Sequence, residues 1–189
     1  NTISQQDVLE LVKTGIMVVI DEAYYEFSGE TMVPLVADYD NLIVLRTFSK
    51  WAGIAGLRVG YGIFPENIAR HIMRIKQPYN VNIAAQIAAI ESLKDIDYLQ
   101  KTTKAITVER GRLFTKLAEL EFFKPLPSKA NFILCSVLNG KAAQIHQELK
   151  RKGIFIRYFD TPFLKDYLRI SVGKPEHTNA LIDALKEIC

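Results

Sequence analysis

The sequence predicts an α/β region with a mostly parallel sheet and covering helices, followed by a small α+β domain. Continuous apolar runs in the first half are typical of strands buried on both faces of a parallel sheet. A long stretch with helical spacing, from about residue 83 to residue 120, separates these runs from further strands and helices. We therefore assign residues 1–82 to the first region and residues 83–189 to the interdomain helix and the small domain.

The first two elements are a helix over residues 4–14 and a strand over residues 16–20. Apolar residues at helical spacing indicate the helix, and Ser4 or Thr2 is of the type that caps a helix N-terminus. The strand is a continuous apolar run, so we expect it to be buried on both faces. Asp21 stands at its carboxyl end.

Two more strands and a helix complete the first region. Residues 42–45 form a second apolar run, and residues 58–64 have the composition of a third strand. Pro65 then opens a helix over residues 66–75, because proline suits the start of a helix and not its interior.

The second half begins with the long helical pattern, which is either one long helix or two helices in tandem. After a break at Pro125 and Pro127, apolar runs and helical spacing alternate. The expected strands are residues 132–137, 154–157 and 168–172, and the expected helices are residues 142–152 and 176–188.

Composition excludes several classes of protein. Hydrophobic residues make up 49% and charged residues 24% of the 189 residues, the balance of an ordinary globular protein. The net charge of +3 is spread along the chain, which argues against a nucleic-acid surface. No apolar run approaches the length of a membrane span, and no metal site is expected. Two cysteines make no disulfide framework, so we expect a reducing, cytoplasmic location.

Polar side chains follow the first two predicted strands where each strand ends. In an open α/β sheet, ligands bind beyond the carboxyl ends of the strands. A carboxylate, a phenol, hydroxyls and an amine delivered to one edge therefore form a candidate site. The residues concerned are Asp21, Glu22 and Tyr24 after the first strand, and Thr47, Ser49 and Lys50 after the second.

These residues carry a resemblance to a known family. The segments 21–24 and 47–61 resemble the core of pyridoxal-phosphate-dependent aminotransferases with the aspartate aminotransferase fold, fold type I. The specific feature is Ser-Lys followed by Gly-x-Arg-x-Gly, and the subgroup most similar is histidinol-phosphate aminotransferase. The resemblance covers essentially the whole chain as the C-terminal part of such an enzyme. It implies transfer of an amino group between L-histidinol phosphate and 2-oxoglutarate.

The resemblance also implies roles around the ring of pyridoxal 5'-phosphate. Lys50 would hold the cofactor through its aldehyde and move a proton, which requires an amine that is partly unprotonated near neutral pH. Asp21 would pair with the protonated ring nitrogen, and Tyr24 would donate to the ring oxygen. The structural alternatives are a surface lysine, a turn carboxylate and an aromatic side chain packed under a loop.

Three further residues would hold the cofactor phosphate according to the resemblance. They are Thr47, Ser49 and Arg58, because hydroxyls and a forked guanidinium suit phosphate oxygens. The alternatives are a pair of turn residues and a salt bridge at a strand start.

Two arginines in the small domain are candidates for substrate binding. Arg157 and Arg169 each lie in an otherwise apolar strand, where a buried guanidinium needs an acidic partner. By resemblance, Arg169 would bind a substrate carboxylate and Arg157 would line the pocket for a distal phosphate. The alternative is an internal ion pair with Asp160 or Asp166.

The resemblance leaves two rival functions and one structural expectation. One rival is another enzyme of the same fold, an aromatic aminotransferase or a threonine-phosphate decarboxylase. The other is a catalytically silent domain used for binding or assembly. The family is homodimeric and has an N-terminal region, with part of the cofactor cage, that finds no match here. We therefore expect the isolated chain to be inactive.

Overall fold

The computed structural model describes residues 2–188 and divides between Thr103 and Lys104 into two units. The boundary between the two units lies within helix α5 (Ile96–Ala118), whereas the boundary expected from the sequence follows residue 82. No helix of the described residues is both long enough and apolar enough to cross a membrane.

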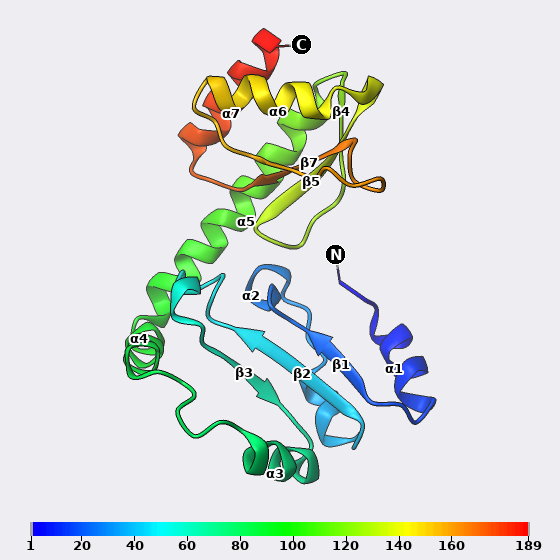
Figure 1. Ribbon diagram of the computed structural model, residues 1–189, viewed down its shortest axis with the longest axis vertical. Helices are drawn as coiled ribbons and strands as arrows, with labels where there is room; N and C mark the ends of the chain where they lie inside the picture. Colours follow the sequence, from blue (N-terminus) through cyan, green and yellow to red (C-terminus); the bar gives the residue numbers. More distant parts are fainter. Residues whose placement is uncertain (1, 189) are drawn as a thin grey trace. The chain divides into compact units, whose positions relative to one another are not determined.

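The first unit opens with helix α1 (Gln5–Lys13), as predicted. The Ser4 side chain caps it by accepting a hydrogen bond from the Asp7 backbone N–H at 3.1 Å. Val8 and Val12, four residues apart on one face, are buried because α1 packs beside strand β1 (Figure 1).

The sheet of the first unit has three strands in the order β1–β2–β3. β1 (Val18–Asp21) and β2 (Leu42–Thr47) are parallel, and Asp21 pairs with Leu45. β3 (Gly60–Ile63) runs antiparallel to β2, so the sheet is mixed. The chain returns from β2 to β3 through a short connection with one 3₁₀ turn (Ala55–Leu57), and a connection without a crossover helix favours antiparallel pairing.

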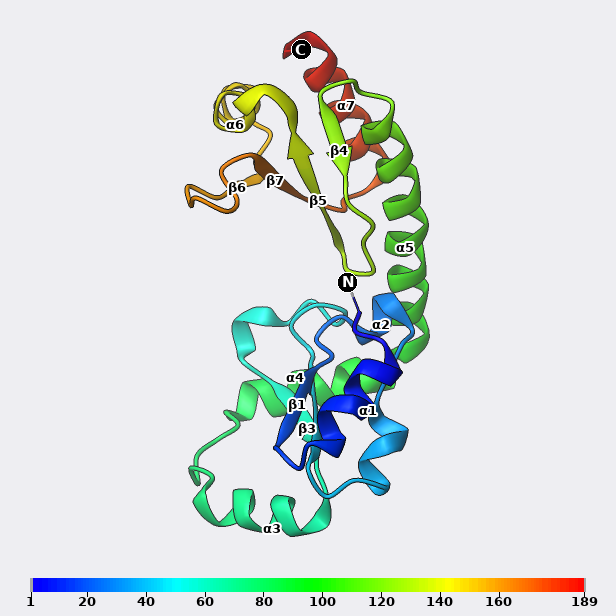
Figure 2. The ribbon, with the colours of Figure 1, turned by 90° about the vertical axis from the view of Figure 1, so that its right-hand side faces the viewer.

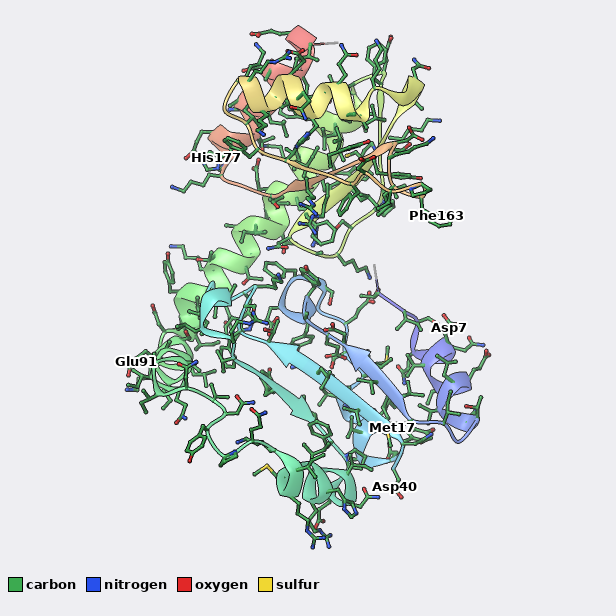
Figure 3. All side chains as sticks on the ribbon, viewed as in Figure 1. Asp7, Met17, Asp40, Glu91, Phe163 and His177 are labelled. Carbon is green, nitrogen blue, oxygen red and sulfur yellow. The ribbon has the colours of Figure 1, made fainter. Side chains whose placement is uncertain are left out.

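The prediction that residues 16–20 are buried on both faces is wrong. Val18 is buried in the core with α1, but Val19 on the opposite face is 51% exposed. Ile16 and Met17 precede the strand and are also exposed; Met17 is labelled in Figure 3. β1 is the edge of the sheet, and only one of its faces is covered by elements of this unit.

Short helical segments complete the first unit. α2 (Tyr25–Ser28) and a 3₁₀ turn (Val33–Ala37) between β1 and β2 were not predicted from the sequence. α3 (Glu66–Ile75) has the predicted bounds, and α4 (Ile83–Lys94) is separated from α5. The long helical pattern is therefore two helices in tandem.

The second unit contains a four-stranded antiparallel sheet in the order β4–β5–β7–β6. Its strands are β4 (Phe123–Pro125), β5 (Phe132–Val137), β6 (Arg157–Tyr158) and β7 (Tyr167–Ser171). The predicted strand over residues 154–157 overlaps β6 only at Arg157, and β4 was not predicted.

Three helices cover one face of this sheet: α5, α6 (Ala142–Arg151) and α7 (Pro175–Ile188). Figure 2 shows α5 running beside β4 and β5. Alternate residues of β5 and β7 point into the shared core, as the period of two in a strand requires. The small α+β domain is thus confirmed, and the residues between the core positions, including Arg169, lie on the other face of the sheet.

Candidate functional site

Lys50 lies in the turn that follows β2, at the edge of the sheet where β1 also ends. Because β1 and β2 are parallel, their carboxyl ends place Asp21 and the turn after Thr47 at the same edge. The Lys50 amine is exposed, and its Nζ is 6.0 Å from the centroid of the Tyr24 ring. An amine, a phenol and a carboxylate therefore share this edge, as the sequence analysis expects.

Asp21 is held by its own turn. Its Oδ1 accepts a hydrogen bond from the Ala23 backbone N–H at 3.0 Å, a common arrangement for an aspartate at a turn. The side chain is exposed, and Oδ2 has no hydrogen bond to the described residues. Oδ1 thus has the role of a turn carboxylate, as in the structural alternative. Oδ2 can still accept a hydrogen bond from another donor.

Tyr24 is the residue before α2 and is half-buried. Its ring centroid is 6.5 Å from that of Phe27, so the packed-aromatic alternative applies to one side of the ring. The side chain therefore packs on its own helix and also lies close to the Lys50 amine.

The turn after β2 brings two hydroxyls together. Thr47 Oγ1 lies 2.9 Å from Ser49 Oγ and accepts a hydrogen bond from the Ser49 backbone N–H at 3.0 Å. Val59, in the segment before β3, is tied to the same turn because its carbonyl accepts from the Phe48 N–H at 3.2 Å. Two neighbouring hydroxyls in a turn of fixed shape suit an anion with several oxygens.

Arg58 has an unusual backbone conformation. Its φ is 58° and its ψ is 46°, in the left-handed region that few residues other than glycine adopt. Its Nη1 donates to the Ala55 carbonyl at 3.0 Å, and the side chain is exposed. The guanidinium is thus hydrogen-bonded within its own loop; its backbone joins the turn of Thr47 through the neighbouring Val59.

Sequence reasoning missed a buried ion pair directly behind this edge. Arg46 donates from Nε and Nη2 to Glu22 Oε2 at 3.0 and 2.9 Å, and Nη2 also lies 2.7 Å from Thr31 Oγ1. Glu22 is only 8% exposed. The available signal was a charged residue beside two of the predicted site residues, because Glu22 follows Asp21 and Arg46 precedes Thr47.

Asn82 caps α4. Its Oδ1 accepts from the Ala85 N–H at 2.9 Å, while Nδ2 donates to the Leu57 carbonyl at 3.1 Å. One side chain thus fixes the start of α4 and the loop that leads to Arg58.

In the second unit, Arg157 and Arg169 are direct partners across β6 and β7. Both guanidinium groups approach the Phe159 ring, with their Cζ atoms 5.3 and 5.9 Å from its centroid. Within the described part of the chain, neither is ion-paired with Asp160 or Asp166 at 4.0 Å or less. The internal ion-pair alternative is therefore wrong for these partners.

Arg169 is suited to receive an anion. Its Nε is buried and has no hydrogen-bond partner in the described structure, which is costly for a charged donor. Like charges directly opposite each other on a sheet also repel. An anion placed against the two guanidinium groups would remove both costs, whereas Arg157 is exposed and contributes mainly charge.

Comparison with known proteins supports one family. The family model for aminotransferase class I and II matches residues 3–185. The chain is 53% identical over 186 residues to a histidinol-phosphate aminotransferase of Dehalococcoides mccartyi, covering 98% of this chain and 52% of that protein. It is 49% identical over 187 residues to the chloroplastic histidinol-phosphate aminotransferase 1 of Arabidopsis thaliana, covering 98% and 45%. The chain thus spans about half the length of the curated relatives it matches.

Solved structures agree with the fold. The histidinol-phosphate aminotransferase of Clostridium acetobutylicum has a TM-score of 0.89 at 27% identity, covering 98% of this chain and 59% of that one. The Sinorhizobium meliloti histidinol-phosphate aminotransferase, solved with pyridoxal-5'-phosphate, has a TM-score of 0.81 at 30% identity, covering 95% and 52%. The predicted fold-type-I architecture is therefore confirmed for the part that the chain spans.

Proposed function

Because the chain belongs to the aminotransferase class I and II family, we propose that it supplies cofactor-binding and substrate-binding residues of a histidinol-phosphate aminotransferase. That enzyme would move an amino group between L-histidinol phosphate and 2-oxoglutarate, a step of histidine biosynthesis. The observation that carries the proposal is the shared sheet edge, where the Lys50 amine, the Tyr24 phenol and the Asp21 carboxylate follow two paired parallel strands. The identity of about 50% to relatives with this name supports the substrate assignment.

The side chains at this edge fit pyridoxal phosphate in their chemistry. When bound, pyridoxal phosphate supplies an electron-withdrawing ring that stabilises negative charge on the substrate carbon. The free Oδ2 of Asp21 would accept a hydrogen bond from the protonated ring nitrogen. The adjacent hydroxyls of Thr47 and Ser49 would donate to the phosphate, together with Arg58 if its guanidinium leaves the Ala55 carbonyl.

Lys50 would have two tasks. Its Nζ would hold the cofactor at the aldehyde carbon, and as a free amine it would take a proton from the substrate carbon. The Tyr24 phenol, whose ring lies beside this amine, would donate a hydrogen bond to the ring oxygen. Both tasks need an amine at the end of a rigid element, and the paired strand β2 provides one.

We propose the arginine pair of the second unit as the anion-binding part of the substrate site. Arg169, with its unpartnered buried Nε, would bind a substrate carboxylate, since a guanidinium fork matches a carboxylate. Arg157 would add charge for a distal phosphate. L-histidinol phosphate carries the phosphate, and 2-oxoglutarate carries the carboxylates.

The assembly and location remain parts of the proposal. We propose a homodimer, and we expect the 189-residue chain alone to lack turnover because it spans about half the length of its relatives. A cytoplasmic location is proposed from composition alone, and the Arabidopsis relative is named chloroplastic.

Borohydride trapping tests the proposal. The chain is incubated with pyridoxal phosphate, reduced and digested, and pyridoxyl-lysine is located by mass spectrometry. We expect the label on the Lys50 peptide, its loss in Lys50→Ala, and its displacement by L-histidinol phosphate before reduction. Lys13→Ala is the matched control, because Lys13 is an exposed lysine in the last turn of α1.

Two other results would overturn parts of the proposal. Label scattered over exposed lysines, with no loss in Lys50→Ala, would contradict the cofactor site. A second result would be specific label at Lys50 that an aromatic amino acid displaces and L-histidinol phosphate does not. This result would support the cofactor site but contradict L-histidinol phosphate as the substrate.

A further inference from the structure

Arg46 is the centre of a polar network that joins all three strands of the first unit. Besides Glu22 and Thr31, it contacts Tyr25, with its Cζ 3.5 Å from the ring centroid. Tyr61 on β3 is its direct strand partner. The network therefore connects the end of β1, the segment around α2, the end of β2 and β3.

The network is well satisfied although it is buried. Glu22 accepts from Arg46, from the Thr31 hydroxyl at 2.8 Å and from the Met32 backbone N–H at 2.5 Å. Burial alone would lower the pKa of Arg46, but hydrogen bonds with Tyr61 and Glu22 and the Glu22 charge raise that pKa above its ordinary value. A buried carboxylate with this many donors holds its position because losing any one of them is costly.

Three members of the network are chain neighbours of proposed cofactor residues. Glu22 follows Asp21, Tyr25 follows Tyr24, and Arg46 precedes Thr47. The Glu22 N–H also donates to the Leu45 carbonyl at 2.8 Å, which extends the β1–β2 ladder by one step. Neighbouring residues of a strand point to opposite faces, so the ion pair lies on one face and Asp21 and Thr47 on the other.

We propose that Glu22 and Arg46 are positioning residues that hold Asp21, Tyr24 and the Thr47 turn in place for the cofactor. They lie on the opposite face of the sheet from Asp21 and Thr47, so they would act through the backbone. They fix the backbone directly behind three residues that would otherwise sit on exposed turns. This inference rests on the proposed cofactor site.

The second unit offers a matched control. Glu109 is likewise buried and accepts from Arg112 Nε at 3.0 Å on each carboxylate oxygen. This pair is on α5 and stabilises the second unit, where none of the cofactor residues is found. Glu22→Gln and Glu109→Gln therefore remove the same charge from similar ion pairs. Only the Glu22 pair adjoins the proposed cofactor site.

The experiment measures cofactor binding and stability in the 189-residue chain. The concentration of pyridoxal phosphate that half-saturates the borohydride label at Lys50 is determined for each variant, beside its Tm. We expect Glu22→Gln to raise the half-saturating concentration at least tenfold and Glu109→Gln to change it less than twofold, although both lower the Tm. We also expect the pH midpoint of the bound cofactor's absorbance to fall in Glu22→Gln, because Arg46 loses its counter-charge, and to stay unchanged in Glu109→Gln.

Arg46→Lys keeps the inference testable if Glu22→Gln fails to fold. Lysine keeps the positive charge but has no fork with which to bind Glu22 and Thr31 together, so the half-saturating concentration should again rise. Equal effects of Glu22→Gln and Glu109→Gln on cofactor binding would contradict the positioning role, and the proposed cofactor site at Lys50 would still stand. Absence of any specific Lys50 label in the unmodified chain would overturn the cofactor site, and the positioning role with it.

Discussion

The two units bury their apolar residues very differently. In the second unit, residues from three helices and both central strands fill one core, with Leu149 and Cys135 each 0% exposed. In the first unit, the main core cluster lies on the face of the sheet that carries Val18, Leu42 and Val44, while Val19 and Leu45 on the other face are exposed. Helix α4 is apolar on most sides, yet Ile83, Ile87, Ile90 and Leu93 are all exposed.

Because of this difference, the larger closed core lies in the second unit, whereas the proposed cofactor residues lie in the first. The second unit has the closed core of a self-sufficient α+β layer. The first unit carries the proposed cofactor residues at the end of a sheet whose second face includes the exposed residues Val19 and Leu45. A helix that is apolar on all sides is normally buried, so α4 has the surface of an element that packs against further protein.

The largest expected effect compares two helical residues. Leu149→Ala removes a fully buried side chain from α6 and should lower the free energy of unfolding by about 2–5 kcal/mol. Ile87→Ala, at a site that is 55% exposed in α4, should change it by less than about 0.5 kcal/mol. Urea unfolding followed by far-UV circular dichroism measures both. A similar loss of unfolding free energy in Ile87→Ala would mean that α4 is packed in solution. It would contradict the difference in burial between the two units.

Cys135 should give the second unit a pH-dependent stability. Burial raises the pKa of this thiol from 9.0 to about 12. The folded state therefore favours the neutral thiol, and this contribution is fully present below pH 9 and is lost as the pH rises towards 12. The loss should be about 1.4 kcal/mol per pH unit above 9.

Unfolding free energies between pH 8 and pH 11, in a Cys189→Ser background with and without Cys135→Ala, measure this slope. Other groups also titrate in this range, so the difference between the two slopes is the informative quantity. Identical slopes would contradict the burial of the thiol in solution.

The smallest effect concerns the caps of two helices in the first unit. Asn82→Ala and Ser4→Ala each remove a side chain that accepts from a backbone N–H, at a cost of about 1 kcal/mol. Asn82→Ala also loses the hydrogen bond to Leu57, on the loop before Arg58, so it alone should weaken pyridoxal phosphate labelling. Equal labelling in both variants, measured beside Tm, would exclude a role of this loop in cofactor binding.

The sequence by itself determined the element types and most of their positions. Helical spacing and caps located α1, α3 and α7 to within a residue or two at each end, and the run at residues 132–137 is strand β5. Lys50, Asp21 and Tyr24 could be chosen because each lies at or shortly after a strand end, and local order along the chain is enough to predict that. Short elements such as β4 and α2 were missed because a few residues carry too little periodicity.

Only the tertiary structure decided which residues are neighbours in space. Whether β1 is covered on one face or two depends on what packs against it, and an apolar run in the sequence does not distinguish these cases. The antiparallel return of β3, the pairing of Arg157 with Arg169 and the Glu22–Arg46 ion pair all join residues far apart in the sequence. Such contacts are set by strand register and side-chain reach, which a one-dimensional pattern does not specify.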